Sequence, residues 1–224
     1  MRLILVRHGQ TPSNVDGLLD TAVPGPSLTP LGFEQAAKLP VALRDEPIES
    51  IYASTQHRAQ QTAAPLAETL GLTVEVRDGL REVDAGDLAM KGDFDSVAQY
   101  MSAIFAWSAG DYSARLPGGE SGESTMRRYD EAIAEVAASG HACATVVSHG
   151  AVIRMWVAAR AANVDATFVE VNAIRNTGIV ILEGTPEEGW MLESWMGTPS
   201  GGLAIDDVTA EDPTGDAYST DDVS

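Results

Sequence analysis

Two short apolar runs in this chain each lead directly into a His-Gly pair, and this repeated arrangement limits the folds open to it. Residues 3–6 read Leu-Ile-Leu-Val and precede Arg-His-Gly at 7–9, while residues 145–147 read Thr-Val-Val and precede Ser-His-Gly at 148–150. Short, continuously apolar runs are typical of strands buried on both faces of a parallel sheet. In open α/β sheets, ligands bind just beyond the carboxyl ends of the strands. We therefore expect both His-Gly pairs at one ligand-binding edge.

The residues of the first pair have chemistry that suits such an edge. Arg7 carries a planar fork of donors that fits phosphate or carboxylate oxygens, and His8 can act as a base, a nucleophile or a metal ligand. Gly9 allows a sharp turn and a close approach of the backbone to a bound group. A single Arg-His-Gly is also compatible with a plain structural turn, but a second pair at His149 is hard to explain as core packing.

The periodicity of the remaining chain alternates strands with helices, which predicts a largely parallel sheet covered on both faces. Predicted strands cover residues 3–6, 48–53, 73–76 and 142–147, and an antiparallel hairpin is predicted at 178–182 and 190–195. Predicted helices begin at Thr29-Pro30 and cover 54–70, 93–107, 121–138 and 151–161.

The acidic composition argues against nucleic acid as a partner. The chain has 33 Asp and Glu against 14 Lys and Arg, a net charge of −19, whereas binding to a phosphate backbone relies on clustered cations. Residues 197–224 hold many of the acids, no Lys or Arg and few large apolar side chains, which favours a flexible tail. We therefore expect a catalytic domain at 1–196 followed by an acidic tail at 197–224.

The sequence also predicts a compartment. No apolar stretch approaches the ~18 residues that a membrane span needs, so no membrane association is expected. Met1 and Arg2 lead straight into the first strand without a signal peptide. Cys143 is the single cysteine, which leaves no intramolecular disulfide and suits a reducing, cytoplasmic location.

Several motifs in order along the chain resemble the histidine phosphatase superfamily, on its phosphoglycerate mutase-like branch. The matching positions are Arg7-His8-Gly9-Gln10-Thr11 with Asn14, residues 54–63 around Arg58, Glu82, and Ser148-His149-Gly150. The resemblance covers residues 1 to about 195. It implies a three-layer α/β/α sandwich whose six-stranded sheet is mostly parallel with one antiparallel strand, which the predicted hairpin supplies.

The resemblance also implies roles for these residues. His8 would attack phosphorus and become phosphohistidine, since neutral imidazole is nucleophilic. Arg7, Arg58 and His149 would clamp the phosphoryl oxygens, and Asn14 would add a neutral donor. Arg58 lies near a predicted helix start, which favours anions, although a surface arginine is the alternative explanation of its position.

Glu82 matches the general acid and base of the family, which needs a raised pKa to protonate a leaving oxygen. Asp84 is a rival carboxylate two residues away, and a solvated loop pair is the alternative for both. Residues 87–92 read Asp-Leu-Ala-Met-Lys-Gly, where the family commonly has an aromatic and an acidic residue before a glycine. This departure leaves the substrate fit undetermined.

We therefore expect a phosphomonoesterase that acts on small phosphorylated metabolites through phosphohistidine. The alternatives are a cofactor-dependent phosphoglycerate mutase and a catalytically weak module that binds phosphorylated ligands. The segment from Glu82 to His149 is short and has few basic residues, which favours hydrolysis. Four scattered histidines form no ligand cluster, so no metal or cofactor is expected. The sequence leaves the substrate and the oligomeric state open, a homodimer included.

Overall fold

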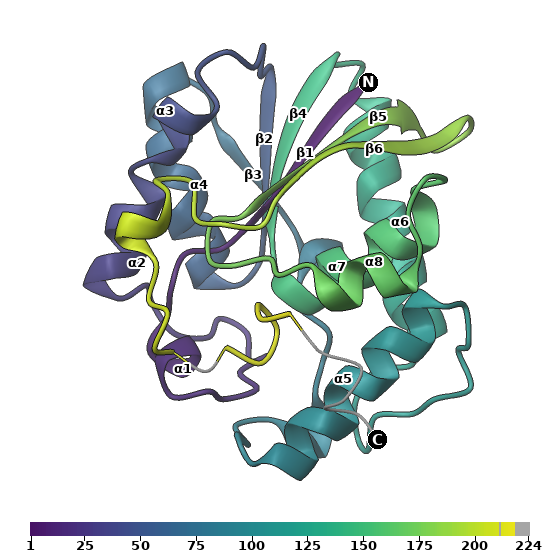
Figure 1. The fold of residues 1–224 in the computed structure, drawn as a ribbon. Helices are drawn as coiled ribbons and strands as arrows, with labels where there is room; N and C mark the ends of the chain where they lie inside the picture. Colours follow the sequence, from purple (N-terminus) through teal and green to yellow (C-terminus); the bar gives the residue numbers. More distant parts are fainter. Residues whose placement is uncertain (211, 218–224) are drawn as a thin grey trace.

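The computed structural model describes residues 1–210 and 212–217, and a six-stranded sheet forms its centre (Figure 1). The strands are β1 (Arg2–Arg7), β2 (Ser50–Ser54), β3 (Val74–Arg77), β4 (Cys143–Ser148), β5 (Ile179–Thr185) and β6 (Gly189–Met196), in the order β3-β2-β4-β1-β5-β6. Pairings among β1 to β4 are parallel, whereas β5 pairs antiparallel with both β1 and β6. The predicted sheet with one reversed strand is confirmed.

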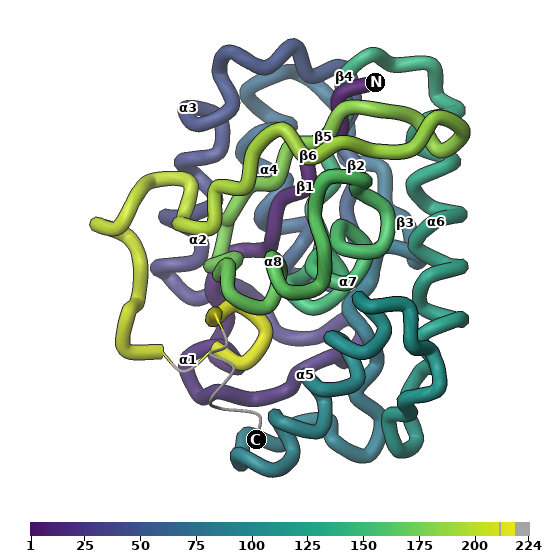
Figure 2. The backbone as a smooth tube through the Cα atoms, turned by 45° about the vertical axis from the view of Figure 1, so that its right-hand side comes forward, coloured from purple at the N-terminus to yellow at the C-terminus, as the bar shows by residue number. Residues whose placement is uncertain are grey.

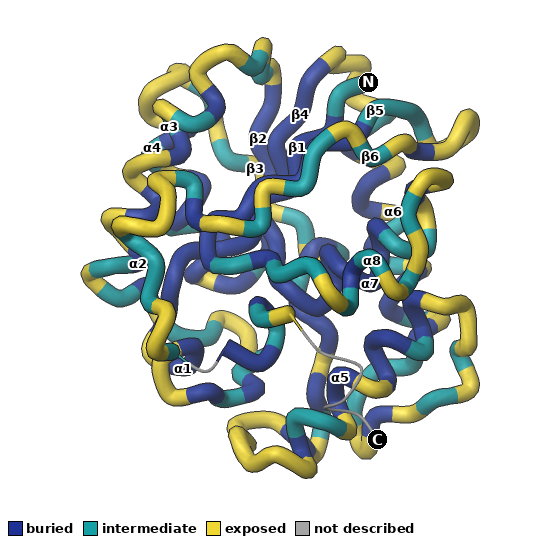
Figure 3. Tube along the Cα trace, viewed as in Figure 1, coloured by how far each residue is buried: buried dark blue, intermediate teal, exposed yellow. Residues whose placement is uncertain are grey.

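Helices cover both faces of this sheet. They are α1 (Pro12–Val15), α2 (Pro30–Ala36), α3 (Leu39–Ala42), α4 (His57–Leu70), α5 (Phe94–Ser108), α6 (Gly122–Ala138), α7 (Gly150–Arg160) and α8 (Ala166–Val171). Helices α2 to α4 lie on one side of the sheet and α5 to α8 on the other (Figure 1). Within β1, Leu3 and Leu5 join the apolar cluster of α5 to α7, while Ile4 and Val6 join that of α3 and α4. The central strands are therefore buried on both faces (Figure 3).

Local sequence signals explain where the helices begin and end. The Thr29 hydroxyl accepts from Gly32 N–H with Pro30 in the first turn of α2, and the Asp93 carboxylate accepts from Ser96 N–H at the start of α5. Gly71 ends α4 with a φ of 67°, a left-handed conformation that favours glycine. Some details differ from the prediction. Helix α4 begins at His57 because β2 continues to Ser54, and the short helices α1, α3 and α8 were not predicted.

The parallel pairing of β1 with β4 brings the two His-Gly pairs together. Arg7 at the end of β1 is in register with Ser148 at the end of β4. The backbone N–H of His8 donates to the Ser148 carbonyl at 3.0 Å, and His149 is the N-cap of α7. The sheet register therefore fixes the separation of the two histidines.

Residues 197–210 and 212–217, here called the C-terminal segment, run across the α2 side toward the carboxyl ends of the strands (Figure 2). Gln35 Nε2 of α2 donates to the Ile205 carbonyl at 2.9 Å, and Ile174 N–H donates to the Gly215 carbonyl at 2.8 Å. These contacts differ from the flexible tail that the composition favours, because their partners lie far away in sequence. The boundary between a domain at 1–196 and a tail at 197–224 stays a prediction, and residues 211 and 218–224 lie outside the described residues.

Candidate active site

His8 lies directly after β1, with 3% of its surface exposed. Its Nδ1 is 2.8 Å from the Gly9 carbonyl oxygen, which can only accept, so Nδ1 carries the proton and Nε2 keeps its lone pair. Burial lowers the pKa of His8 well below its ordinary value of 6.5, and the nearby Arg58 and Arg7 guanidinium groups lower it further. The ring is therefore neutral at physiological pH, and its Nε2 can act as a nucleophile.

His149 stands beside His8 at the start of α7. The centroids of the two rings are 5.1 Å apart, and the ring planes are inclined by 54°. Burial lowers the pKa of His149 well below 6.5, and Arg58 is the next largest cause. Its Nδ1 accepts from Arg58 Nε at 3.3 Å, and among the described residues its Nε2 has no hydrogen-bond partner.

Arg58 occupies the first turn of α4, and its guanidinium lies almost completely buried beside both histidines. Its Nη2 donates to the Asp20 carbonyl at 3.0 Å, whereas its Nη1 has no hydrogen-bond partner in the described part of the chain. Burial lowers the pKa of Arg58 below its ordinary value, although the charges of Glu82 and Asp20 oppose this effect. The position is therefore inside the site, and a surface arginine, the alternative from the sequence, does not apply.

Glu82 reaches the same cavity from the loop that follows β3. Its carboxylate accepts from the N–H groups of Val83, Ala151 and Val152 at 2.9, 3.1 and 2.9 Å, the last two at the start of α7. Burial raises the pKa of Glu82 from 4.5, while these N–H groups and Arg58 partly offset the rise. Asp84, the rival carboxylate, is exposed and accepts from Gly86 N–H, so the structure does not bring it into the site.

Arg7 and Asn14 lie in the same region, but their donors point to the C-terminal segment. Arg7 is fully buried, and its Nη1 and Nη2 lie 2.6 and 2.8 Å from the two oxygens of Asp212. Asn14 Nδ2 donates to Asp212 Oδ1 at 3.2 Å, and its own Oδ1 accepts from Thr11 N–H and Oγ1. An internal carboxylate therefore binds two of the predicted phosphate ligands.

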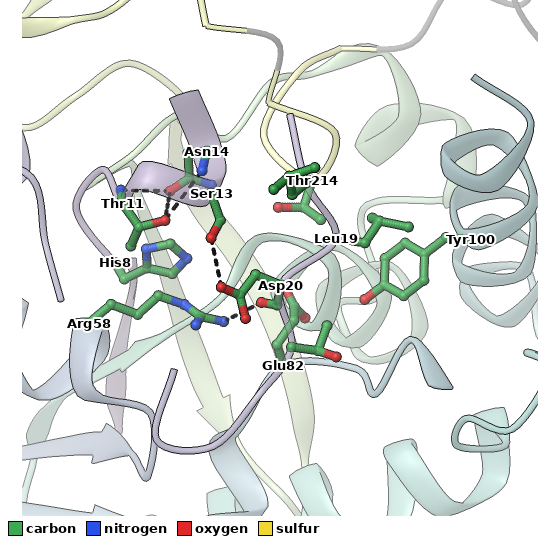
Figure 4. Close-up of a pocket in the computed structure, with 12 residues that line it drawn as sticks. His8, Thr11, Ser13, Asn14, Leu19, Asp20, Arg58, Glu82, Tyr100 and Thr214 are labelled. Carbon is green, nitrogen blue, oxygen red and sulfur yellow. Dashed lines mark hydrogen bonds between the residues drawn. The ribbon is translucent and has the colours of Figure 1, made fainter. Parts of the chain in front are cut away.

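A small cavity lies at the carboxyl ends of the strands, and its lining includes His8, Asn14, Arg58 and Glu82 (Figure 4). Its water-accessible volume is about 20 Å³. Its walls also include Ser13, Leu19, Asp20, Tyr100 and Thr214, whereas Arg7 and His149 lie outside this lining. The sequence offers no local signal for these five, because each lies in a loop or on a helix whose approach to His8 depends on the assembled fold.

A sheet edge that carries two neutral histidines, a buried arginine and a buried carboxyl group defines an α/β enzyme of phosphoryl-group chemistry. The family model of the histidine phosphatase superfamily (branch 1) matches residues 3–197, so the chain belongs to that superfamily. It is a phosphomonoester hydrolase of the phosphoglycerate mutase-like type.

Individual relatives agree with this placement. The chain is 35% identical over 219 residues to the PE-PGRS family protein PE_PGRS11 of Mycobacterium tuberculosis. This alignment covers 89% of this chain but only 37% of that protein. It is 32% identical over 160 residues to the adenosylcobalamin/alpha-ribazole phosphatase of Escherichia coli, covering 70% of this chain and 78% of the relative. A solved structure of mycobacterial glucosyl-3-phosphoglycerate phosphatase with VO3 matches with a TM-score of 0.74 at 29% identity, covering 88% of this chain and 99% of that one.

Two further observations concern the described residues only. None of their helices has the length and apolar content that a membrane crossing requires. No group of three or more His, Cys, Asp or Glu side chains among them is arranged to hold a metal ion.

Proposed function

We propose that this chain hydrolyses small phosphomonoesters through a covalent phosphohistidine at His8. The observation that carries the proposal is the hydrogen bond from His8 Nδ1 to the Gly9 carbonyl, which leaves Nε2 free beside the donors of Arg58 and His149. A neutral, oriented imidazole next to fixed cationic donors suits attack on phosphorus.

In the first step, His8 Nε2 forms a bond to phosphorus, and the bond from phosphorus to the ester oxygen breaks. The phosphoryl oxygens are held by four side chains, those of Arg58, His149, Arg7 and Asn14. Glu82 gives its proton to the departing alkoxide. In the second step, water attacks phosphorus, Glu82 takes a proton from that water, and His8 and inorganic phosphate are released. Proton transfer of this kind contributes about 10²–10⁴-fold to the rate.

The environment of Glu82 supports both of its roles. Burial raises the pKa, so the carboxyl group can hold a proton for the first step. The N–H groups of Ala151 and Val152, at the amino end of α7, stabilise the carboxylate that the first step leaves behind. The same contacts keep the group ready to accept a proton from water.

The charges around the cavity support hydrolysis rather than mutase activity. A mutase must hold a doubly phosphorylated ligand, which requires additional cations. Among the described residues that line the cavity, Arg58 is the one Arg or Lys, and Asp20 adds a carboxylate. Lys91 and Arg115 are exposed outside that lining, and Arg128 donates to backbone carbonyls of the Glu82 loop. We therefore propose a monophosphorylated metabolite as the substrate. On the composition of the chain, we further propose that the enzyme works in the cytoplasm and does not bind nucleic acid.

The test compares two histidine variants. His8→Ala should lose about 10³-fold or more of the activity on p-nitrophenyl phosphate, whereas His57→Ala, one residue before Arg58 and exposed, should keep it. Rapid quenching of the wild type should trap an acid-labile phosphate, which mass spectrometry should place on His8. Full activity of His8→Ala, or a label on another residue, would overturn the mechanism.

A further inference from the structure

The buried ion pair between Arg7 and Asp212 joins the first strand to the C-terminal segment. The two side chains are 0% and 4% exposed, and both guanidinium Nη atoms reach the carboxylate at 2.6 and 2.8 Å. Arg7 Nη1 also donates to the Ile174 carbonyl at 2.9 Å, and Nη2 to Thr214 Oγ1 at 3.1 Å. With Asp212, Arg7 therefore makes one hydrogen bond, from Nη2 to Oδ1, and one ion-pair contact, from Nη1 to Oδ2, and a guanidinium uses the same donors for phosphate oxygens.

Asp212 binds a second predicted phosphate ligand, Asn14, in addition to Arg7. Its Oδ1 accepts from both Arg7 Nη2 and Asn14 Nδ2, so two predicted phosphate ligands converge on one carboxylate oxygen. Thr214, two residues further on, forms part of the cavity wall. The water-accessible volume of the cavity is about 20 Å³ with this segment in place, so its departure would make more room for a phosphoryl group.

The contacts around Asp212 form a built site. A Cβ atom on Gly215 would lie 1.9 Å from Arg7 Nη1, and one on Gly150 would lie 2.5 Å from the Thr214 carbonyl oxygen, so side chains at these positions would prevent this approach. Arg154 Nη2 donates to the carbonyls of Gly215 and Asp216, which anchors the segment from the side of α7.

A phosphoryl group has partners available that the carboxylate does not use. Arg58 Nη1 and His149 Nε2 are buried without hydrogen-bond partners in the described part of the chain. A phosphomonoester dianion carries more charge and more acceptor oxygens than a carboxylate, so it can bind these donors in addition to Arg7 and Asn14. The dianion can therefore displace the carboxylate, whereas a singly charged carboxylate ligand has little advantage over Asp212.

We propose that Asp212 is an internal carboxylate ligand of the anion site, which a phosphoryl group must displace from Arg7 and Asn14 before it binds. The proposal rests on the proposed function in one respect, the use of Arg7 and Asn14 as phosphate ligands. Asp212 thereby sets the affinity of the site and discriminates against weakly charged ligands. Movement of residues 212–217 precedes or accompanies each binding event.

The first test measures binding of orthovanadate and inorganic phosphate to the full chain by isothermal titration calorimetry. If the carboxylate leaves Arg7 in about a tenth of the molecules, Asp212→Asn should tighten the apparent affinity about tenfold. Asp206→Asn, which removes another carboxylate of the same segment, should leave the affinity unchanged. An unchanged or weaker affinity in Asp212→Asn would overturn the proposal, and a weaker affinity would identify Asp212 as a residue that positions Arg7 for the ligand.

The second test uses the unaltered chain, so it holds even if Asp212→Asn does not fold. Hydrogen exchange at residues 212–217 is measured with and without saturating orthovanadate. Displacement predicts faster exchange in this segment with vanadate, while equal or slower exchange would contradict it. Neither readout requires turnover, so failure of the phosphohistidine test and failure of this proposal are distinguishable.

Discussion

At the scale of single residues, Glu82 allows the two steps of the proposed mechanism to be separated by the choice of substrate. Glu82→Gln removes the proton donor of the first step, so the kcat/KM for an alkyl phosphomonoester should fall by about 10²–10⁴-fold. The loss in kcat/KM should be much smaller for p-nitrophenyl phosphate, because nitrophenolate departs without a proton and kcat/KM does not include the second step, in which Glu82 acts as the base for both substrates. Steady-state kinetics on both substrates measures the difference, and Asp84→Asn is the matched control because Asp84 is exposed. Equal losses on both substrates would exclude Glu82 as the acid.

The buried histidines also make the stability of the protein depend on pH. Both His8 and His149 have a pKa well below 6.5 in the folded chain, so as the pH falls through 6.5 the unfolded chain takes up protons first and stability is lost. The raised pKa of Glu82 acts in the opposite sense, lowering stability as the pH rises above 4.5. Below pH 6.5, His8→Asn should reduce the slope of the unfolding free energy by up to about 1.4 kcal/mol per pH unit.

Denaturant unfolding between pH 5 and 7 measures this slope. His57→Asn is the control, since His57 is exposed in the folded chain. A slope that stays the same in His8→Asn would mean that His8 is as easily protonated in the folded chain as in the unfolded one.

At the scale of the elements, the contact between α6 and the Glu82 loop holds the acid in place. Arg128 of α6 donates to the carbonyls of Gly79, Arg81 and Glu82 at 2.7 to 2.9 Å, and it pairs with Glu120. An ammonium group cannot reproduce this fork of donors. Arg128→Lys should therefore lower kcat/KM for alkyl phosphomonoesters more than for p-nitrophenyl phosphate, in the same pattern as Glu82→Gln but more weakly.

Arg127 offers a matched control, because it is the preceding residue of the same helix and is exposed. Arg127→Lys should leave both activities unchanged. If Arg128→Lys lowers both activities by the same factor, the arginine supports the fold in general and not the position of Glu82.

The elements were largely predictable because their signals are local. The continuous apolar run of β1, the Thr29-Pro30 start of α2 and the Gly71 end of α4 each act within a few residues. The approach of His8 to His149 followed from one further rule, that carboxyl ends of parallel strands share an edge. Helix α8 was not predicted, because six residues are too few to show a helical period.

At the scale of the whole molecule, we expect the C-terminal segment to contribute to stability. Ending the chain at Met196 removes the carboxylate partner of Arg7 and the hydrogen bonds of the segment to Gln35 and Ile174, which together should cost roughly 1 kcal/mol or more. We expect the Tm to fall by about 3 °C or more, measured by differential scanning calorimetry. A chain that ends at Ala217 keeps every contact described above and should melt like the full chain. Equal Tm values for all three chains would show that the segment adds no stability.

The partnership of Arg7 with Asp212 could not be predicted from the sequence, because 205 residues separate the two. The composition of residues 197–224 favours flexibility, and nothing in it identifies which acidic residue meets the arginine. The free donors of Arg58 and His149 likewise depend on how the strands and helices are assembled. The motifs therefore predict which residues form the site, whereas only the fold shows which of their donors are paired within the protein and which are free.

The strand order has a consequence for synthesis on the ribosome, where the chain emerges from its amino end. Strand β1 is hydrogen-bonded to β4 on one side and β5 on the other, and β4 also separates it from β2. Neither β2 nor β3, the next two strands to emerge, can therefore pair with β1 in the native arrangement. The central strand has to wait until Ser148 has left the exit tunnel, and during that time its apolar residues are available to chaperones and to other nascent chains.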